Sequence, residues 1–104
     1  MVRAIQIDAV GGAEVLKLQQ VDIGAPGPGE VRLRHTAIGV NYIDVYYRSG
    51  LYSAPLPLIP GMEAAGVIEA LGPDVGSFSV GDRVSYAGAL GSYSEARIIK
   101  ADRL

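Results

Sequence analysis

Glycine and proline set the strongest constraint on this 104-residue chain. Its 14 glycines and 6 prolines interrupt the sequence every few residues. Proline lacks the amide donor that a helix or a central strand needs, and glycine loses more backbone entropy than any other residue when it is fixed. This spacing therefore favours many short strands joined by turns over long helices.

Composition excludes several classes of protein. Hydrophobic residues make up 49% of the chain, which is enough for the packed core of one small domain and argues against disorder. The net charge is -2 and the nine basic residues are spread out, so no nucleic-acid-binding surface and no anionic-membrane surface is indicated. The chain has no cysteine, hence no disulfide and no thiolate metal site. With no signal peptide and no apolar run of membrane-spanning length, we expect a cytoplasmic protein.

Alternating side chains predict the strands. In the clearest one, 30–40, Val31, Leu33 and His35 share an apolar face with Ala37. His35 is the only histidine, and because a metal site needs several such ligands we interpret it as structural. A half-buried strand is expected at 16–21 and a strand buried on both faces at 64–68. Further strands are expected at 2–7, 83–87 and 93–100.

One segment, 41–50, predicts a helix. Asn41 is a good N-cap, and Asp44 lies in the first turn, where the helix dipole favours a negative charge. Gly50 is placed to end the helix in a left-handed conformation. Asp44 and Arg48 are four residues apart, so we expect them to pair across one turn.

Tyrosines are concentrated in and after this segment. Tyr42 and Tyr46 fall on one helix face, where they either pack as amphipathic wedges or offer hydroxyl donors to a bound carbonyl group. The segment 51–60 adds Tyr52 and three prolines. It is more apolar than a solvated loop, so it could cover a cleft or face a neighbouring domain.

A glutamate, Glu63, stands in a run of glycine, methionine and alanine. An ionised carboxylate is costly there unless it is paired or hydrogen-bonded. Gly61 and Gly66 bracket it, and their lack of a Cβ atom lets another backbone or a ligand approach closely. Glu63 is therefore either a strand residue that faces solvent or part of a site.

Four runs in this order resemble the N-terminal, GroES-like catalytic domain of the medium-chain dehydrogenase/reductase superfamily: 37–52, 59–67, 81–84 and 91–95. Within it, the chain is most similar to the zinc-independent quinone oxidoreductases, the zeta-crystallin branch. The resemblance implies a mainly β (α+β) fold over residues 1–104, a partly open barrel with one short helix. Asn41 and Met62 stand where zinc-using members carry cysteine and histidine, and no cysteine-rich lobe occurs at 88–92. The resemblance therefore implies that zinc is absent.

This family transfers a hydride or electrons from NADPH to a quinone or a similar electron-poor acceptor, in a cleft beside a dinucleotide-binding domain. The resemblance assigns Tyr46, Arg48 and Tyr52 to the acceptor. It implies that Glu63 holds the helix by hydrogen bonds rather than moving protons. The residues assigned to the nicotinamide end of the cofactor are Asn41, Tyr42, Ile43, Asp44, Val45 and Tyr46.

The family's glycine-rich dinucleotide-binding domain has no counterpart within these 104 residues. We therefore expect a fragment of a longer enzyme that is inactive by itself and forms homo-oligomers. Two alternatives stay open. One is a stand-alone GroES-like binding or assembly module, which would have no need of a tyrosine-rich helix. The other, within the enzymes, is a 2-enal or enoyl reductase, because the same cleft can reduce an activated double bond.

Overall fold

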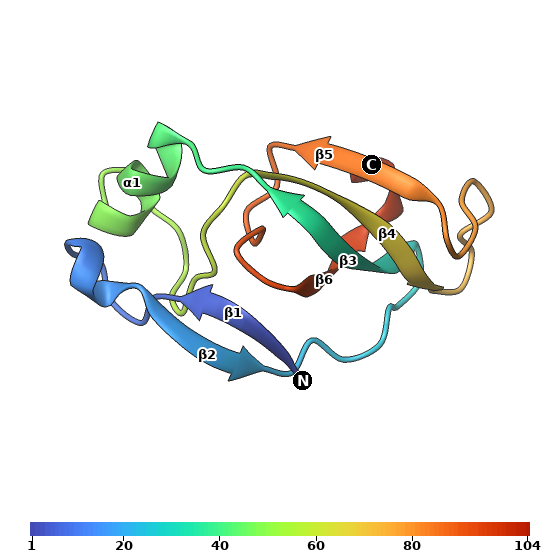
Figure 1. The fold of residues 1–104 in the computed structure, drawn as a ribbon, viewed down its shortest axis with the longest axis horizontal. Helices are drawn as coiled ribbons and strands as arrows, with labels where there is room; N and C mark the ends of the chain where they lie inside the picture. The colour runs from blue at the N-terminus through green and yellow to red at the C-terminus, as the bar shows by residue number, and fades with distance from the viewer.

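The computed structural model describes residues 1–104 as two antiparallel sheets and one α-helix (Figure 1). The helix α1 spans Tyr42–Ser49, and two short 3-10 turns are η1 (Ala13–Val15) and η2 (Ala101–Arg103). No helix has the length and apolar character needed to cross a membrane. The strands are β1 (Val2–Gln6), β2 (Lys17–Val21), β3 (Glu30–Ile38), β4 (Glu63–Leu71), β5 (Arg83–Ala87) and β6 (Ala96–Lys100).

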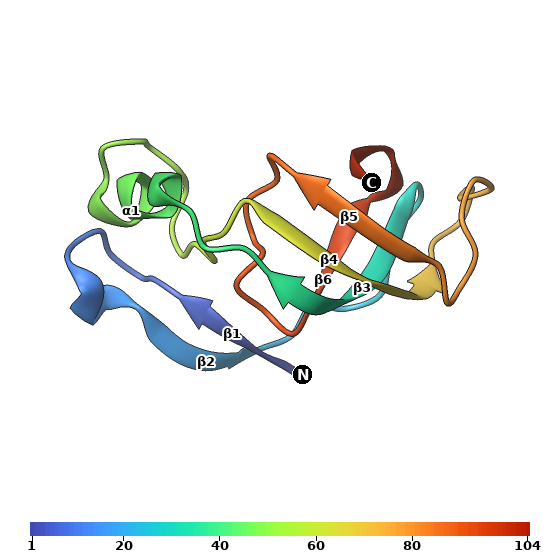
Figure 2. The same cartoon turned by 45° about the horizontal axis from the view of Figure 1, so that its top comes forward.

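The two sheets lie side by side and stay open. The larger sheet has the order β5-β4-β3-β6, and β1 pairs only with β2 (Figure 2). Isolated bridges link Ala4 to Ser94 and Ile7 to Leu58, which join the β1–β2 ribbon to the rest of the chain. The outer edges of β2, β5 and β6 have no strand partner. The expected mainly β, partly open arrangement with one short helix is confirmed.

Strand β3 is the centre of the larger sheet because it pairs with both β4 and β6. Val31 and Leu33 are fully buried and His35 is 9% exposed, which confirms the predicted apolar face. Ala37 is exposed instead, since a register shift between His35 and Ala37 turns the end of the strand. In β4 only one face is buried, and Val67 on the other face is partly exposed, so the expectation of burial on both faces was too strong.

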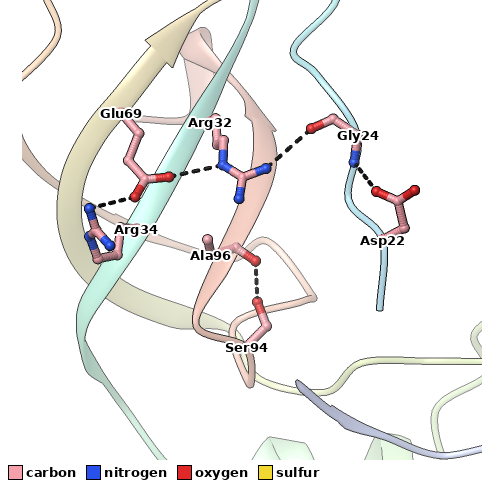
Figure 3. Close-up of polar contacts among 7 residues, drawn as sticks. All are labelled: Asp22, Gly24, Arg32, Arg34, Glu69, Ser94 and Ala96. Carbon is pink, nitrogen blue, oxygen red and sulfur yellow. Dashed lines mark hydrogen bonds and ion pairs between the residues drawn. The ribbon is translucent and has the colours of Figure 1, made fainter. Parts of the chain in front are cut away.

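A carboxylate between two arginines ties the 22–29 loop to the larger sheet (Figure 3). Glu69 of β4 accepts from Arg32 Nε at 2.9 Å, and its other oxygen lies 2.7 Å from an Arg34 nitrogen. Arg32 also donates to the Gly24 carbonyl at 3.3 Å. Partly exposed ion pairs of this kind contribute little stability, about 1 kcal/mol or less each. Their main effect here is to fix where the loop lies.

Two strand predictions need correction. In β2, Leu18 is 66% exposed, so the strand is not half-buried; no other strand pairs with its outer edge. Strand β6 begins at Ala96 rather than at Tyr93. The Tyr93 amide donates to the Pro60 carbonyl at 2.9 Å, and this contact directs the 91–95 segment towards the helix.

A buried hydrogen-bond network surrounds His35. His35 Nδ1 lies 2.8 Å from the Ser94 carbonyl oxygen, so this nitrogen carries a hydrogen and donates it. Its Nε2 lies 2.9 Å from the Tyr86 hydroxyl, and a neutral imidazole accepts from that hydroxyl. The Tyr86 oxygen also lies 2.8 Å from Ser92 Oγ and accepts from Arg97 Nη1 at 3.1 Å. These contacts agree with a structural role for His35.

Acid is therefore expected to destabilise the fold through His35. Burial first, and the Arg97 cation also, lower the pKa of His35, and its hydrogen bond to Ser94 opposes them only in part. Below about pH 6.5 the unfolded chain binds this proton and the folded chain does not, so the free energy of unfolding falls as pH decreases, by up to about 1.4 kcal/mol per pH unit. Urea unfolding between about pH 7.5 and about pH 5.5 measures this. His35→Gln should lose that part of the pH dependence, and an unchanged slope in the variant contradicts the assignment.

Candidate functional site

The helix α1 and the β1–β2 connection lie at the same end of the molecule (Figures 1 and 2). Asn41 precedes the helix in an extended conformation, and its backbone amide donates to Asp44 Oδ2 at 3.0 Å. Gly50 ends the helix at φ 88°, in the left-handed region that suits glycine. Both predicted helix ends are confirmed. The caps fix where the side chains of an otherwise marginal eight-residue helix point.

The buried face of α1 is polar and is held by tertiary contacts. Asp44 is 4% exposed and accepts from the Tyr93 hydroxyl at 2.5 Å. Arg48 Nε donates to the Gly11 carbonyl at 3.1 Å, and the Gly11 amide donates to the Arg48 carbonyl at 3.0 Å. The predicted Asp44–Arg48 ion pair was wrong, because each side chain bonds to a different distant partner.

The exposed face of α1 carries the tyrosines. Tyr46 and Tyr52 are 36% and 45% exposed, and their ring centroids lie 5.4 Å apart. The Tyr52 amide donates to the Tyr46 carbonyl at 3.0 Å, which returns the chain to the helix. Tyr42 and Tyr47 extend the cluster, at 6.5 Å from Tyr46 and 5.6 Å from Tyr52. Neither the Tyr46 nor the Tyr52 hydroxyl bonds within the chain, so both are free to donate to a ligand.

The structure thus brings together two of the three residues predicted to contact the acceptor. Tyr46 and Tyr52 are neighbours, whereas the Arg48 guanidinium bonds to the Gly11 carbonyl, away from the exposed tyrosine face. Among the predicted nicotinamide residues, Tyr42 and Val45 are exposed, Ile43 is partly buried and Asp44 is buried. A flat ring could contact the exposed members of this set directly.

Glu63 contacts the start of the helix. Asn41 Nδ2 donates to Glu63 Oε1 at 3.0 Å, which agrees with the supporting role predicted for this glutamate. A Cβ atom at Gly39 would lie 2.2 Å from the same oxygen, so glycine at 39 leaves room for the contact. A surface hollow of about 520 Å³ lies beside it, lined in part by Ile38, Gly39, Glu63, Ser85 and Ala87.

No three His, Cys, Asp or Glu side chains come close enough together to hold a metal ion. At the two positions where the family resemblance implies zinc ligands in zinc-using members, the Asn41 side-chain amide donates to Glu63, and Met62 offers only a thioether. His35, the only histidine, uses both ring nitrogens inside the core. This donor set does not fit a zinc centre, and the absence of zinc in solution stays a prediction.

Tyr93 is the contact that sequence reasoning missed. A strand at 93–100 was predicted, whereas the ring of Tyr93 lies over Gly61 and its hydroxyl reaches Asp44. Burial first, and the Asp44 carboxylate, raise the pKa of Tyr93 well above its ordinary value, so the phenol stays a donor. Its only sequence signal was membership of the 91–95 run, which does not show where the ring points.

Residues 27–104 match the family described as "Alcohol dehydrogenase GroES-like domain". The chain belongs to this family. A crystal structure of a quinone oxidoreductase from Pseudomonas syringae superposes with a TM-score of 0.94 at 51% identity, covering 99% of this chain and 32% of that one. The Escherichia coli quinone oxidoreductase complexed with NADPH gives a TM-score of 0.93 at 43% identity, covering 97% of this chain and 32% of that one. These superpositions confirm the expected GroES-like fold.

Curated relatives carry two kinds of oxidoreductase name. A quinone oxidoreductase of Pseudomonas aeruginosa is 53% identical over 106 residues, which cover 100% of this chain and 33% of the relative. A 2-haloacrylate reductase of a Burkholderia species is 46% identical over 110 residues, again 100% of this chain and 33% of the relative. The chain therefore spans about a third of the length of the relatives it matches.

Proposed function

We propose that this chain is the acceptor-binding part of an NADPH-dependent quinone oxidoreductase that works without zinc. The observation that carries the proposal is the Tyr46–Tyr52 pair, two exposed rings 5.4 Å apart whose hydroxyls have no partner in the chain. A quinone is a flat, electron-poor ring with carbonyl oxygens, so stacking and phenol donors both suit it. Similarity to quinone oxidoreductases, one of them complexed with NADPH, supports the cofactor and the acceptor class.

The residues divide into positioning and contact roles. Bound NADPH supplies the hydride or electrons, and this chain orients the acceptor against the nicotinamide. Tyr46 and Tyr52 donate to an acceptor carbonyl, where a hydrogen bond also stabilises the negative charge that reduction places on that oxygen. We assign Asn41, whose side chain donates to Glu63, to the nicotinamide end of the site. The geometry favours a helix-tethering role for Arg48, because its guanidinium is bound to Gly11.

The cofactor fits this surface only in part. The exposed side chains of Tyr42, Val45 and Tyr46 suit the nicotinamide ring. The only α-helix is α1, and its first turn already contains the carboxylate of Asp44, which repels a pyrophosphate. We therefore propose that the phosphates bind to a dinucleotide-binding domain outside these 104 residues.

The 46% identity to a 2-haloacrylate reductase favours a second candidate, reduction of an activated double bond. Such a substrate also presents an electron-withdrawing carbonyl group to the two phenols. Turnover of a p-quinone, a 2-enal and a 2-haloacrylate by one enzyme carrying this chain separates the two candidates. Quinone turnover with no detectable turnover of the other two supports the proposal, and the reverse order replaces it with the second candidate.

Removing one hydroxyl tests the role of the tyrosine pair. In an enzyme that joins this chain to a dinucleotide-binding domain, Tyr46→Phe or Tyr52→Phe is expected to lower kcat/KM for the quinone by about two- to tenfold, the effect of one lost hydrogen bond. The free energy of unfolding should change by less than about 0.5 kcal/mol, because the rings stay in place.

Tyr47→Phe is the matched control. Its ring also contacts Tyr52, at 5.6 Å, but its hydroxyl has no proposed ligand. Steady-state kinetics on the three variants and the wild type decide the matter. Unchanged turnover in both Tyr46→Phe and Tyr52→Phe would show that these rings only pack.

A further inference from the structure

We propose that Tyr93 is a positioning residue that fixes the orientation of α1 and so aims the exposed tyrosine face. Tyr93 does not itself lie on that face and touches no group proposed to meet the acceptor. The effect of Tyr93 on quinone reduction rests on the proposed function. Its effect on the orientation of α1 rests only on the geometry of the helix.

One carboxylate oxygen joins Tyr93 to the start of the helix. Asp44 Oδ2 accepts from the Tyr93 hydroxyl at 2.5 Å and from the Asn41 amide at 3.0 Å. The other oxygen of Asp44 is buried and has no hydrogen-bond partner. Tyr93 is thus the only side chain that donates to this buried carboxylate. A hydrogen bond to an ionised group is about twice as strong as a neutral one.

The ring of Tyr93 is itself fixed in place. A Cβ atom at Gly61 would lie 2.5 Å from Tyr93 Cδ1, so the ring lies directly against the Gly61 backbone. The Tyr93 amide donates to the Pro60 carbonyl at 2.9 Å, and the Ser92 amide donates to the Gly61 carbonyl at 3.2 Å. The Tyr93 ring therefore links the 60–61 backbone to the helix. Glycine at 61 leaves the space that the ring occupies.

Other contacts also hold α1. The Asn41–Glu63 hydrogen bond is exposed, and two hydrogen bonds between Arg48 and Gly11 hold the far end of the helix. The Tyr93–Asp44 hydrogen bond is partly buried, so water competes with it less than with the exposed Asn41–Glu63 contact. The Tyr93 phenol also stays protonated, because burial and the neighbouring Asp44 raise its pKa. Tyr93 is therefore a constant donor and is not expected to add a step to the pH profile of the enzyme.

Hydrogen–deuterium exchange on the 104-residue chain tests the structural part. Tyr93→Phe keeps the ring and removes only the hydroxyl, so peptides covering 42–49 are expected to exchange on the order of tenfold faster or more. Peptides covering β3 and β4 should keep the wild-type rate. Tyr47→Phe removes a hydroxyl of the same helix that makes no hydrogen bond. Its exchange rates should match those of the wild type in all peptides.

Each other outcome counts against the inference. Unchanged exchange in α1 would show that Tyr93 does not hold the helix. Faster exchange across β3 and β4 as well, or loss of the fold, would show a general structural role instead of a local one.

Kinetics of the enzyme that carries this chain test the catalytic part. Tyr93→Phe should lower kcat/KM for the quinone while the KM for NADPH stays within about twofold. The losses of kcat/KM caused by Tyr93→Phe and by Tyr46→Phe should be less than additive in the double variant. The reason is that Tyr93 acts by positioning the Tyr46 hydroxyl, which Tyr46→Phe removes. An inactive wild-type enzyme would count against the proposed function alone, since the exchange result stands without it. An active wild type with additive variants would overturn the coupling of Tyr93 to the site.

Discussion

Replacement of Gly66 by alanine is expected to destabilise the fold by about 3 kcal/mol or more. An added Cβ would lie 2.2 Å from the Arg34 carbonyl oxygen and 3.1 Å from Leu33 Cδ1. Neither strand can easily move away, because β4 also pairs with β5 and β3 also pairs with β6. The clash is with backbone at the centre of the sheet, so a change of side-chain rotamer cannot relieve it. Urea unfolding gives the free energy directly.

Gly76→Ala is the matched control. A Cβ at Gly76 would meet nothing within 4 Å, and this glycine is not among those with a positive φ. Its substitution should change the free energy of unfolding by less than about 1 kcal/mol. A small increase in stability is expected, because alanine reduces the number of conformations of the unfolded chain. Equal stability of the Gly66 and Gly76 variants would contradict the described β3–β4 pairing.

The 104-residue chain alone is expected to show no measurable NADPH-dependent quinone reduction. Without a site for the pyrophosphate, the cofactor would contact only the proposed nicotinamide surface of Tyr42, Val45 and Tyr46, and the nicotinamide would not be held against the acceptor. Turnover should be at least about a thousandfold below that of the chain joined to a dinucleotide-binding domain. Rates of NADPH-dependent quinone reduction by the two proteins, assayed side by side at equal concentration, measure this difference. Comparable rates would overturn the proposed division of the site between two domains.

The same chain is expected to self-associate. Leu18, Val40 and Leu51 are 66%, 81% and 69% exposed, and the outer edge of β2 has no partner. Exposed apolar side chains and open strand edges favour association. Light scattering across a dilution series should show a mass that rises with concentration. A constant monomer mass over that series would contradict this expectation.

The features that the sequence predicted well are those determined by near neighbours. The helix at 41–50 follows from its caps, and the buried face of β3 follows from simple alternation of side chains. The family resemblance gives Glu63 a supporting role; the structure has a 3.0 Å hydrogen bond from Asn41 to Glu63, and the role itself stays a prediction.

The features that were missed depend on residues far apart in the chain. The rule for side chains four apart predicted an Asp44–Arg48 pair, but Asp44 bonds 49 residues away to Tyr93 and Arg48 bonds 37 residues away to Gly11. Pairing rules for isolated helices do not include such partners. The exposed Ala37 depends on a register shift in the pairing of β3 with β4, which no local pattern in β3 reveals.

The most direct test of the central claim is quinone reduction measured together with metal content. The enzyme that joins this chain to a dinucleotide-binding domain is dialysed against a strong chelator and assayed with NADPH and a p-quinone. Because Asn41 and Met62 give zinc no usual ligands, we predict full turnover with less than about 0.1 zinc per chain. Loss of turnover on chelation that added zinc restores, or no turnover with any quinone at any metal content, would contradict the account.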